Sequence, residues 1–209
     1  MTQFEPVPTS FFFWGQREYV QGSHVADGFL HALDVWQVGK LGKMKIIFHM
    51  PIVNQGVMVR YPDKEALVEA RESLNAELHG VTENGDIFIG LKCQGEPVED
   101  RLEDNELSLV SSAVLAPDEN RVEMPFRGEA SLATLLVALN KLLLNEILPG
   151  DGYVPWIVGR LVIQNVAGSR ACKEIGVQLL NNVANTMTRS RVFLDGSAGG
   201  EIQFIRSRV

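Results

Sequence analysis

The chain has 209 residues, of which 45% are hydrophobic and 22% are charged, and its formal net charge is −7. This length is enough for one large core or for two fused smaller units, and the composition is that of an ordinary globular protein. The acidic balance argues against a nucleic-acid-binding protein, because such proteins neutralise phosphates with clustered lysine and arginine.

The first half of the chain predicts an extended arm, a strand and then a helix. Residues 1–10 contain Pro6 and Pro8 and are expected to form the arm, and 11–20 is predicted as a strand. The segment 23–36 is predicted as a helix with Ser23 as its N-cap. One face of this helix would carry the apolar residues Val25, Phe29, Ala32, Leu33 and Trp36, and another the polar residues His24, Asp27, His31 and Asp34.

Further strands are predicted after this helix, at 45–49 and 57–61, together with a hairpin over 76–92. The pair Asn84-Gly85 is the strongest hairpin signal in the chain. The segment 63–73 is rich in helix formers and fits either a short helical insertion or a continuation of the strand. We leave both interpretations open.

The second half repeats this order of elements. We interpret 94–120 as the connection between the halves plus a first strand at 107–115, which 121–126 extends. A very apolar helix is predicted at 130–147, and strands at 156–164 and 174–184. A last hairpin is predicted over 189–206, turning at 195–200 and including the Gly199-Gly200 pair.

Two sets of markers indicate that one supersecondary unit is duplicated. Gly22 and Gly128 precede the two predicted helices, and Asp86 and Glu201 open the last strand of each half. The separation between the two glycines is nearly the same as the separation between the two acids, as an internal repeat requires. We therefore predict an α+β protein with two units, 1–100 and 101–209.

Neither metal, cofactor nor membrane attachment is predicted. Cys93 and Cys172 lack metal-ligand spacing and are expected to be free thiols of structural role in a cytoplasmic protein. The N-terminal apolar run, 11–14, is too short for a signal peptide or a membrane span. No phosphate-binding G-x-x-x-x-G-K-[ST] loop is present, so no cofactor is expected.

The order of strand, long buried helix and antiparallel strands resembles the hot-dog fold, in which a curved sheet wraps one hydrophobic helix. Residues 13–33 are similar to the start of that helix in β-hydroxyacyl-carrier-protein dehydratases, whose pattern is roughly H-x-x-G-x-P-x-M-P-G-x-x-x-x-[DE]-A. Gly22 matches the glycine of this pattern and Asp27 matches its acid, whereas Gly28 stands in place of the alanine.

The same comparison shows where the chain departs from a dehydratase. The family's histidine would stand nine residues before the glycine, where this chain has Phe13. In the second half, the equivalent positions around Gly128 are Glu119 and Ala133, which supply neither a histidine nor an acid. Thioesterases of the hot-dog fold work with one carboxylate and the amides at a helix start, and proteins similar to A-factor synthase carry two hot-dog units.

The resemblance implies two tandem hot-dog units, each with a long central helix wrapped by an antiparallel sheet, that form a pseudo-dimer. It implies an acyl-carrier-protein or acyl-CoA partner and a thioesterase or dehydratase activity in fatty-acid or polyketide metabolism. A non-catalytic binding or assembly module is the alternative. Neither nucleic acid nor membrane is expected as a partner, and the oligomeric state stays open, with a homodimer as one option.

If the chain is an enzyme, Asp27 is the expected general base, and His24 or His31 is its partner. The amides that follow Gly22, beginning with Ser23, would stabilise the oxyanion, since a helix N-terminus favours negative charge. Phe13 and Trp14 are expected to line an acyl tunnel. The competing interpretation makes His24, Asp27 and His31 a hydrated helix face and the aromatic residues ordinary core.

Overall fold

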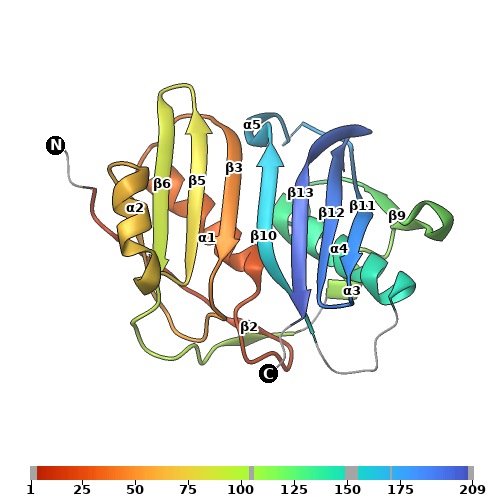
Figure 1. Cartoon of the computed structure of the whole chain (residues 1–209), viewed down its shortest axis with the longest axis horizontal. Coiled ribbons are helices and arrows are strands. Elements are labelled where there is room, and N and C mark those ends of the chain that lie inside the picture. The colour runs from red at the N-terminus through yellow and green to blue at the C-terminus, as the bar shows by residue number, and fades with distance from the viewer. Residues whose placement is uncertain (1–3, 104–105, 149–154, 170, 207–209) are drawn as a thin grey trace. The chain divides into compact units, whose positions relative to one another are not determined.

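The chain divides into two compact units, Met1–Asp104 and Asn105–Val209. The computed structural model describes residues 4–103, 106–148, 155–169 and 171–206. Each unit contains a long helix and an antiparallel sheet, so the architecture is α+β (Figure 1).

The sheet of the first unit runs in the order β1-β4-β6-β5-β3, and its neighbours are antiparallel. A separate parallel pair joins β2 to β7. The bounds are β1 (Val7–Pro8), β2 (Phe13–Trp14), β3 (Leu41–Phe48), β4 (Val57–Tyr61), β5 (Ala76–Thr82), β6 (Gly85–Lys92) and β7 (Arg101–Leu102).

The strand predicted at 11–20 is therefore wrong except for β2. Gly15 adopts a positive φ of 58°, and the Arg17 amide donates to the Trp14 carbonyl, so the chain turns directly after Trp14. The strand β2 ends because this turn leads the backbone away from β7, the short strand with which β2 pairs.

The long helix of the first unit, α1 (Gly22–Val35), buries the apolar face that the sequence predicts. Val25, Phe29 and Ala32 are fully buried, and Leu33 is nearly so. The predicted N-cap is wrong: the helix begins one residue earlier, with Gln21 as N-cap, and Ser23 lies inside the first turn. The buried Ser23 hydroxyl donates instead to Gln21 Oε1, at 3.3 Å.

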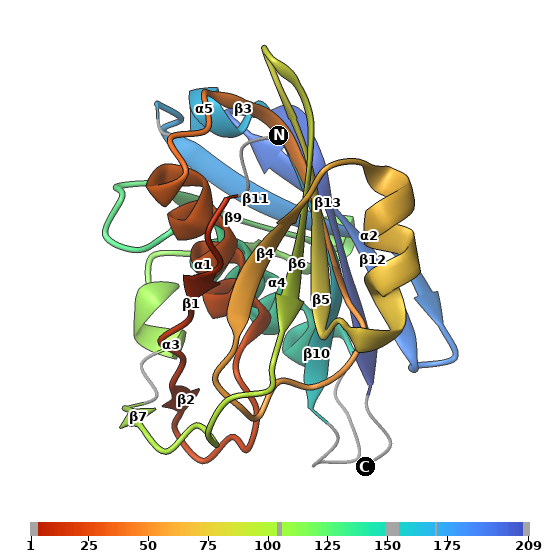
Figure 2. The ribbon, with the colours of Figure 1, turned by 90° about the vertical axis from the view of Figure 1, so that its left-hand side faces the viewer.

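The undecided segment 63–73 is helical, as α2 (Lys64–Ala70) and the 3-10 turn η1 (Arg71–Ser73). Asp63 caps α2, since its carboxylate accepts a hydrogen bond from the Ala66 amide at 2.8 Å. Leu67 packs with Leu74 and Phe88 against the sheet. Figure 2 shows α1 and α2 on opposite faces of this sheet.

The sheet of the second unit runs in the order β8-β9-β11-β12-β13-β10, again antiparallel. Its strands are β8 (Val114–Ala116), β9 (Arg121–Pro125), β10 (Trp156–Gln164), β11 (Glu174–Val183), β12 (Met187–Leu194) and β13 (Ser197–Arg206). Its helices are α3 (Glu106–Leu109), the 3-10 turn η2 (Pro117–Glu119), α4 (Leu132–Ile147) and α5 (Val166–Ser169).

The structure corrects two details of this half. The segment 107–126 is not one extended strand: α3 occupies its start, and β8 and β9 form a hairpin around η2. The last turn is also shorter than predicted, because it lies at Asp195-Gly196 and Gly199-Gly200 belongs to β13. Gly200 is needed there, since a Cβ would lie 2.0 Å from the Val162 carbonyl oxygen.

The helix α4 is buried on nearly every side, and Figure 1 shows it behind β11, β12 and β13. Ser131 caps it by accepting a hydrogen bond from the Thr134 amide, at 3.1 Å. Among the described residues of α4, the buried ones are Ala133, Thr134, Leu135, Leu136, Val137, Ala138, Leu139, Asn140, Leu143 and Leu144. Burial of this apolar helix is the main contribution to the core of the second unit.

The two units differ in how their last three strands are arranged. In the second unit, β11, β12 and β13 follow one another as neighbours. In the first unit, β4 is followed along the chain by α2 and η1, which lead to β5, and β6 then returns to lie between β4 and β5. A tight turn at 184–186 joins β11 to β12 and forces them to pair, whereas the helical insertion allows β5 to lie one position further away.

An ion pair between an exposed arginine and a buried carboxylate attaches the helical insertion to the sheet of the first unit. Glu77 of β5 is only 5% exposed, and Arg71 donates to both of its carboxylate oxygens at 2.9 Å. His49 Nε2 lies 3.3 Å from the same carboxylate. The hydrogen bonds that Arg71 donates to Glu77, together with the negative charge of Glu77, raise the pKa of Arg71. A buried carboxylate is tolerated only when it is paired in this way.

We predict that Arg71→Met lowers the free energy of unfolding by about 2–3 kcal/mol, because it removes charge-assisted hydrogen bonds from a buried carboxylate. Denaturant titration measures the change. The double variant Arg71→Met/Glu77→Met should recover most of the loss, since both polar partners are then removed. Arg189→Met, which breaks the pair between the exposed Arg189 and the half-buried Glu201, is the control and should change stability less than Arg71→Met does, because Glu201 is less buried than Glu77. A loss as small as that of the control would contradict a structural role for Arg71.

The cysteines are free and belong to the packed interior. Cys172 is buried, and Cys93 is half-buried with its amide donating to Asn75 Oδ1 at 3.0 Å. Burial raises the pKa of Cys93 to about 12. Burial and the negative charge of Asp195 raise the pKa of Cys172 as well. Since the thiolate is the reactive form, neither thiol is an activated nucleophile.

We therefore predict slow alkylation of Cys93 by iodoacetamide in the folded Cys172→Ser variant. The raised pKa keeps the thiol protonated, so the rate should still be rising with pH above the range where an ordinary cysteine has levelled off. Mass spectrometry of timed samples measures it, with the urea-unfolded chain as reference. A rate that levels off at the same pH in the folded and unfolded chains would show that burial does not suppress ionisation.

Candidate functional site

The helix α1 carries the polar residues that the sequence singles out, and their exposure differs. His24 and Asp27 are half-buried and lie one turn apart, whereas His31 is exposed on the solvent side. Asp27 lies in the second turn, because α1 begins at Gly22 and its first turn contains no acid. The helix dipole acts mainly within the first turn, so it affects Asp27 only weakly.

Aromatic residues surround His24. The imidazole centroid lies 4.2 Å from the Phe12 ring and 5.0 Å from the Trp14 ring, the latter in an edge-on arrangement. Trp14 is only 7% exposed. The segment before α1 therefore packs aromatic side chains against His24, in the first turn of the helix.

The segment that carries these aromatic residues is held from one side by Arg101. β2 pairs with β7, and the Arg101 guanidinium donates to the carbonyls of Gly15 and Arg17 at 3.0 and 2.9 Å. The same guanidinium lies over the Phe13 ring, 5.1 Å from its centroid. Phe13, at 8% exposure, is thus a packed residue of β2.

Gln55 holds the segment from the other side. Its side-chain Oε1 accepts from the Phe11 amide and its Nε2 donates to the Phe11 carbonyl, both at 2.7 Å. These are the two hydrogen bonds that a neighbouring strand would supply to Phe11. The Gly56 amide also donates to the Thr9 hydroxyl, at 2.7 Å. The backbone of the segment that carries Phe12 and Trp14 is therefore held in place by polar contacts.

The amides at the start of α1 are only partly available to a ligand. The His24 and Val25 amides both donate to the Gln21 carbonyl, at 3.0 and 3.3 Å. Any oxyanion donors at this helix start are therefore the amides before them, of Gly22 and Ser23. This is a smaller set than the sequence analysis allows.

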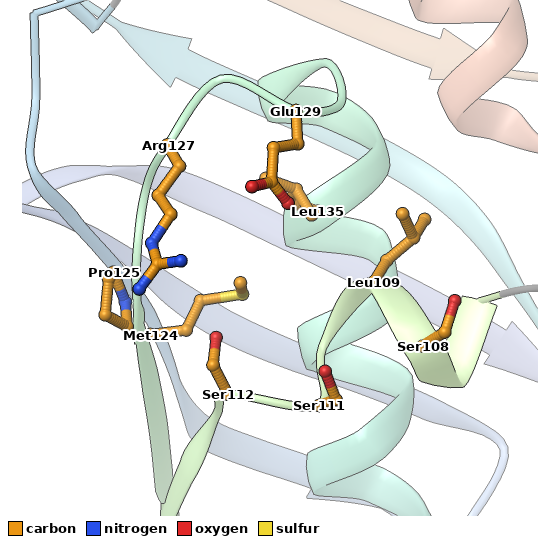
Figure 3. Close-up of a pocket in the computed structure, with 9 residues that line it drawn as sticks. All are labelled: Ser108, Leu109, Ser111, Ser112, Met124, Pro125, Arg127, Glu129 and Leu135. Atoms are coloured by element: carbon orange, nitrogen blue, oxygen red, sulfur yellow. The ribbon is translucent and has the colours of Figure 1, made fainter.

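A cavity of about 130 Å³ lies in the second unit (Figure 3). Met124, Leu109 and Leu135 give it apolar walls, and Figure 3 shows the side chains of Arg127 and Glu129 pointing toward its centre. The remaining lining residues are Ser108, Ser111, Ser112 and Pro125. Leu135 belongs to the first turn of α4, so the cavity lies beside the start of the second long helix.

Arg127 and Glu129 are functional candidates that the sequence patterns do not indicate. They flank Gly128, the glycine that precedes the second predicted helix. Gly128 has a φ of 73°, a backbone conformation that favours glycine, and the residues on either side of it both line the cavity. A charged residue on each side of a glycine before a helix is the signal that could have indicated them.

The described residues contain no group of three or more His, Cys, Asp and Glu side chains arranged to hold a metal ion. Among the described helices, none combines the length and the apolar character that crossing a membrane requires.

The comparisons with known proteins rest on structure. No protein-family model matches the sequence, and no curated protein matches it. A proposed thioesterase from Novosphingobium aromaticivorans matches 97% of this chain with 94% of its own, at 10% identity and a TM-score of 0.51. A proposed thioesterase II from Thermobifida fusca matches 93% with 90%, at 8% identity and a TM-score of 0.48.

The dehydratase domain of PpsC from Mycobacterium tuberculosis, in complex with C12:1-CoA, matches 90% of this chain with 85% of its own, at 10% identity and a TM-score of 0.48. The likeness to the Novosphingobium structure extends over nearly the whole chain and concerns the fold. The sequence-based resemblance is confirmed at that level: the chain has the fold of the hot-dog proteins.

Proposed function

We propose that the chain acts on an acyl thioester carried by coenzyme A or by an acyl-carrier protein, in fatty-acid or polyketide metabolism. The observation that carries this proposal is the half-buried Asp27, one helical turn from His24, whose ring contacts Phe12 and Trp14. The thioesterase description of the Novosphingobium structure supports it.

Hydrolysis fits these residues better than dehydration. A dehydratase of the family uses a histidine where this chain has Phe13, and Phe13 is packed under Arg101. Hydrolysis requires only one carboxylate. Asp27 would take a proton from water, the water oxygen would attack the thioester carbonyl, and the Gly22 and Ser23 amides would stabilise the oxyanion. The C–S bond then breaks, and the thiolate leaves and takes up a proton, giving an acid and a thiol.

We propose that the two units form the pseudo-dimer of a double hot dog. Taken alone, the sheet of the first unit ends at β3 and that of the second unit ends at β10. Each is the strand that follows the long helix of its unit. An unpaired edge strand exposes backbone donors and acceptors, so edge-to-edge pairing of two hot-dog units would protect such strands. The free cysteines support a reducing compartment such as the cytoplasm.

A non-catalytic module that binds an acyl chain is the second candidate. The hydrogen bond from the His24 amide to the Gln21 carbonyl favours it, because it removes one donor from the helix start. His31, which is exposed, also offers no enclosed catalytic partner to Asp27. In this second candidate function, the protein binds the same acyl thioester but does not hydrolyse it.

We predict that Asp27→Asn lowers thioester hydrolysis by about 10²–10⁴-fold, because an amide cannot accept the proton of the attacking water. Acyl-CoA thioesters of increasing chain length are the substrates, and thiol release measures the rate. Asp34→Asn is the matched control: it makes the same chemical change on an exposed residue of the same helix and should retain full activity.

Equal melting temperatures of the two variants would show that the loss is chemical. Acyl-CoA binding without turnover in the wild type would favour the binding module. If the wild type neither binds nor turns over any acyl thioester, the thioester function itself is rejected.

A further inference from the structure

The cavity of the second unit is lined by one positive and one negative side chain that do not neutralise each other. Arg127 and Glu129 both point toward its centre (Figure 3). Within the described part of the chain, neither side chain forms an ion pair or a hydrogen bond. Arg121 and Glu123, which are also two residues apart, do form an ion pair. The charges of Arg127 and Glu129 are therefore both available to a bound molecule.

The short segment that carries both charges is anchored at its two ends. Before it, the Phe126 amide donates to the Lys173 carbonyl at 2.7 Å. After it, the Ser131 hydroxyl accepts from the Thr134 amide at 3.1 Å and donates to the Thr134 hydroxyl at 3.0 Å. A segment held in this way loses little freedom when a ligand binds, so less of the binding free energy is lost to ordering.

The size and the walls of the cavity limit what it can hold. Its volume of about 130 Å³ is close to the roughly 150 Å³ of an engineered protein cavity that binds benzene, so a fitting ligand has about as many non-hydrogen atoms as benzene. Met124, Leu109 and Leu135 give apolar walls, and the lining also includes Ser111 and Ser112. A fitting ligand therefore combines a short apolar group with polar ones.

Charge selects among the molecules of this size. A simple anion would be attracted by Arg127 but repelled by Glu129, and a simple cation would be repelled by Arg127. A molecule that carries both charges meets an opposite charge at each end. A free amino acid is such a molecule, whereas a residue within a peptide lacks at least one of the two charges.

We infer that this cavity binds a small free amino acid, such as alanine, with its carboxylate on Arg127 and its ammonium group on Glu129. The guanidinium offers two parallel N–H donors that match a carboxylate, and the three ammonium protons suit the Glu129 carboxylate and the serine hydroxyls. The methyl group of alanine suits the apolar walls. The inference goes beyond the proposed thioester function and does not rest on it, since none of the lining residues belongs to the Asp27 site.

The test is titration of the full chain with L-alanine, propionate and ethylamine, followed by NMR chemical shifts. Propionate lacks the amino group of alanine and ethylamine lacks its carboxylate, whereas the apolar part is the same. We expect alanine to bind with a Kd of about 1 mM or below, and about tenfold or more tightly than either of the other two, because each of them loses one charge-assisted contact.

Three variants separate the two charges. Arg127→Gln should abolish alanine binding. Glu129→Gln should weaken alanine binding and strengthen propionate binding, because it removes the repulsion of a lone carboxylate, and a merely structural role of Glu129 predicts no such reversal. Glu146→Gln makes the same chemical change on an exposed residue of α4 outside the cavity, so this control should bind alanine like the wild type.

The residues that are changed are exposed, so all three variants should keep the melting temperature of the wild type. Absence of alanine binding at about ten times the expected Kd would overturn the inference. Equal binding of alanine and propionate by the wild type would also overturn it and would indicate an adventitious anion site only. An unchanged alanine affinity in Arg127→Gln would overturn it as well. None of these outcomes affects the thioester function, which is tested separately through Asp27.

Discussion

The contact between a long apolar helix and one face of an antiparallel sheet is the constraint on which each unit depends. α4 presents ten buried side chains on 16 residues, and such a helix is stable only when it is covered. α1 is more amphipathic, so it is covered on one side and carries His24, Asp27 and His31 on the other. The difference in polarity between the two helices explains why the candidate carboxylate lies in the first unit.

The two units differ in whether their buried polar groups have hydrogen-bond partners. In the first unit, the buried Glu77 carboxylate has a bidentate partner in Arg71, so its charge is compensated within the protein. In the second unit, Asn140 lies among leucines, and no described residue bonds to its amide. An unsatisfied buried polar group costs about 1–3 kcal/mol, a large fraction of a typical net stability. Such a group persists where something besides stability requires it.

Much of the fold could be predicted from hydrophobic periodicity. The strands β4 and β10 have the predicted bounds, and the helices α1 and α4 are predicted within two residues at each end. The predictions fail where contacts with other residues determine the local structure. Ser23 is a good N-cap by residue type, yet its hydroxyl donates to Gln21. Segment 11–20 has strand composition, but Gly15 turns the backbone away after β2.

The candidate site was predicted only in part, because sequence spacing places residues along one helix and says little about what covers it. Asp27 and His24 could be found from the helical pattern. The Phe12 and Trp14 rings against His24 depend on Gln55 and Arg101, which are distant in sequence. The cavity beside Arg127 and Glu129 depends likewise on α3 and β9 meeting the start of α4.

The different strand orders of the two units limit how the halves can exchange parts. Because β5 and β6 are placed by the helical insertion and β12 and β13 by a tight turn, a recombined gene that gave one half the closing hairpin of the other would join strands to the wrong neighbours. The halves can therefore accumulate substitutions separately but cannot be shuffled by simple crossover.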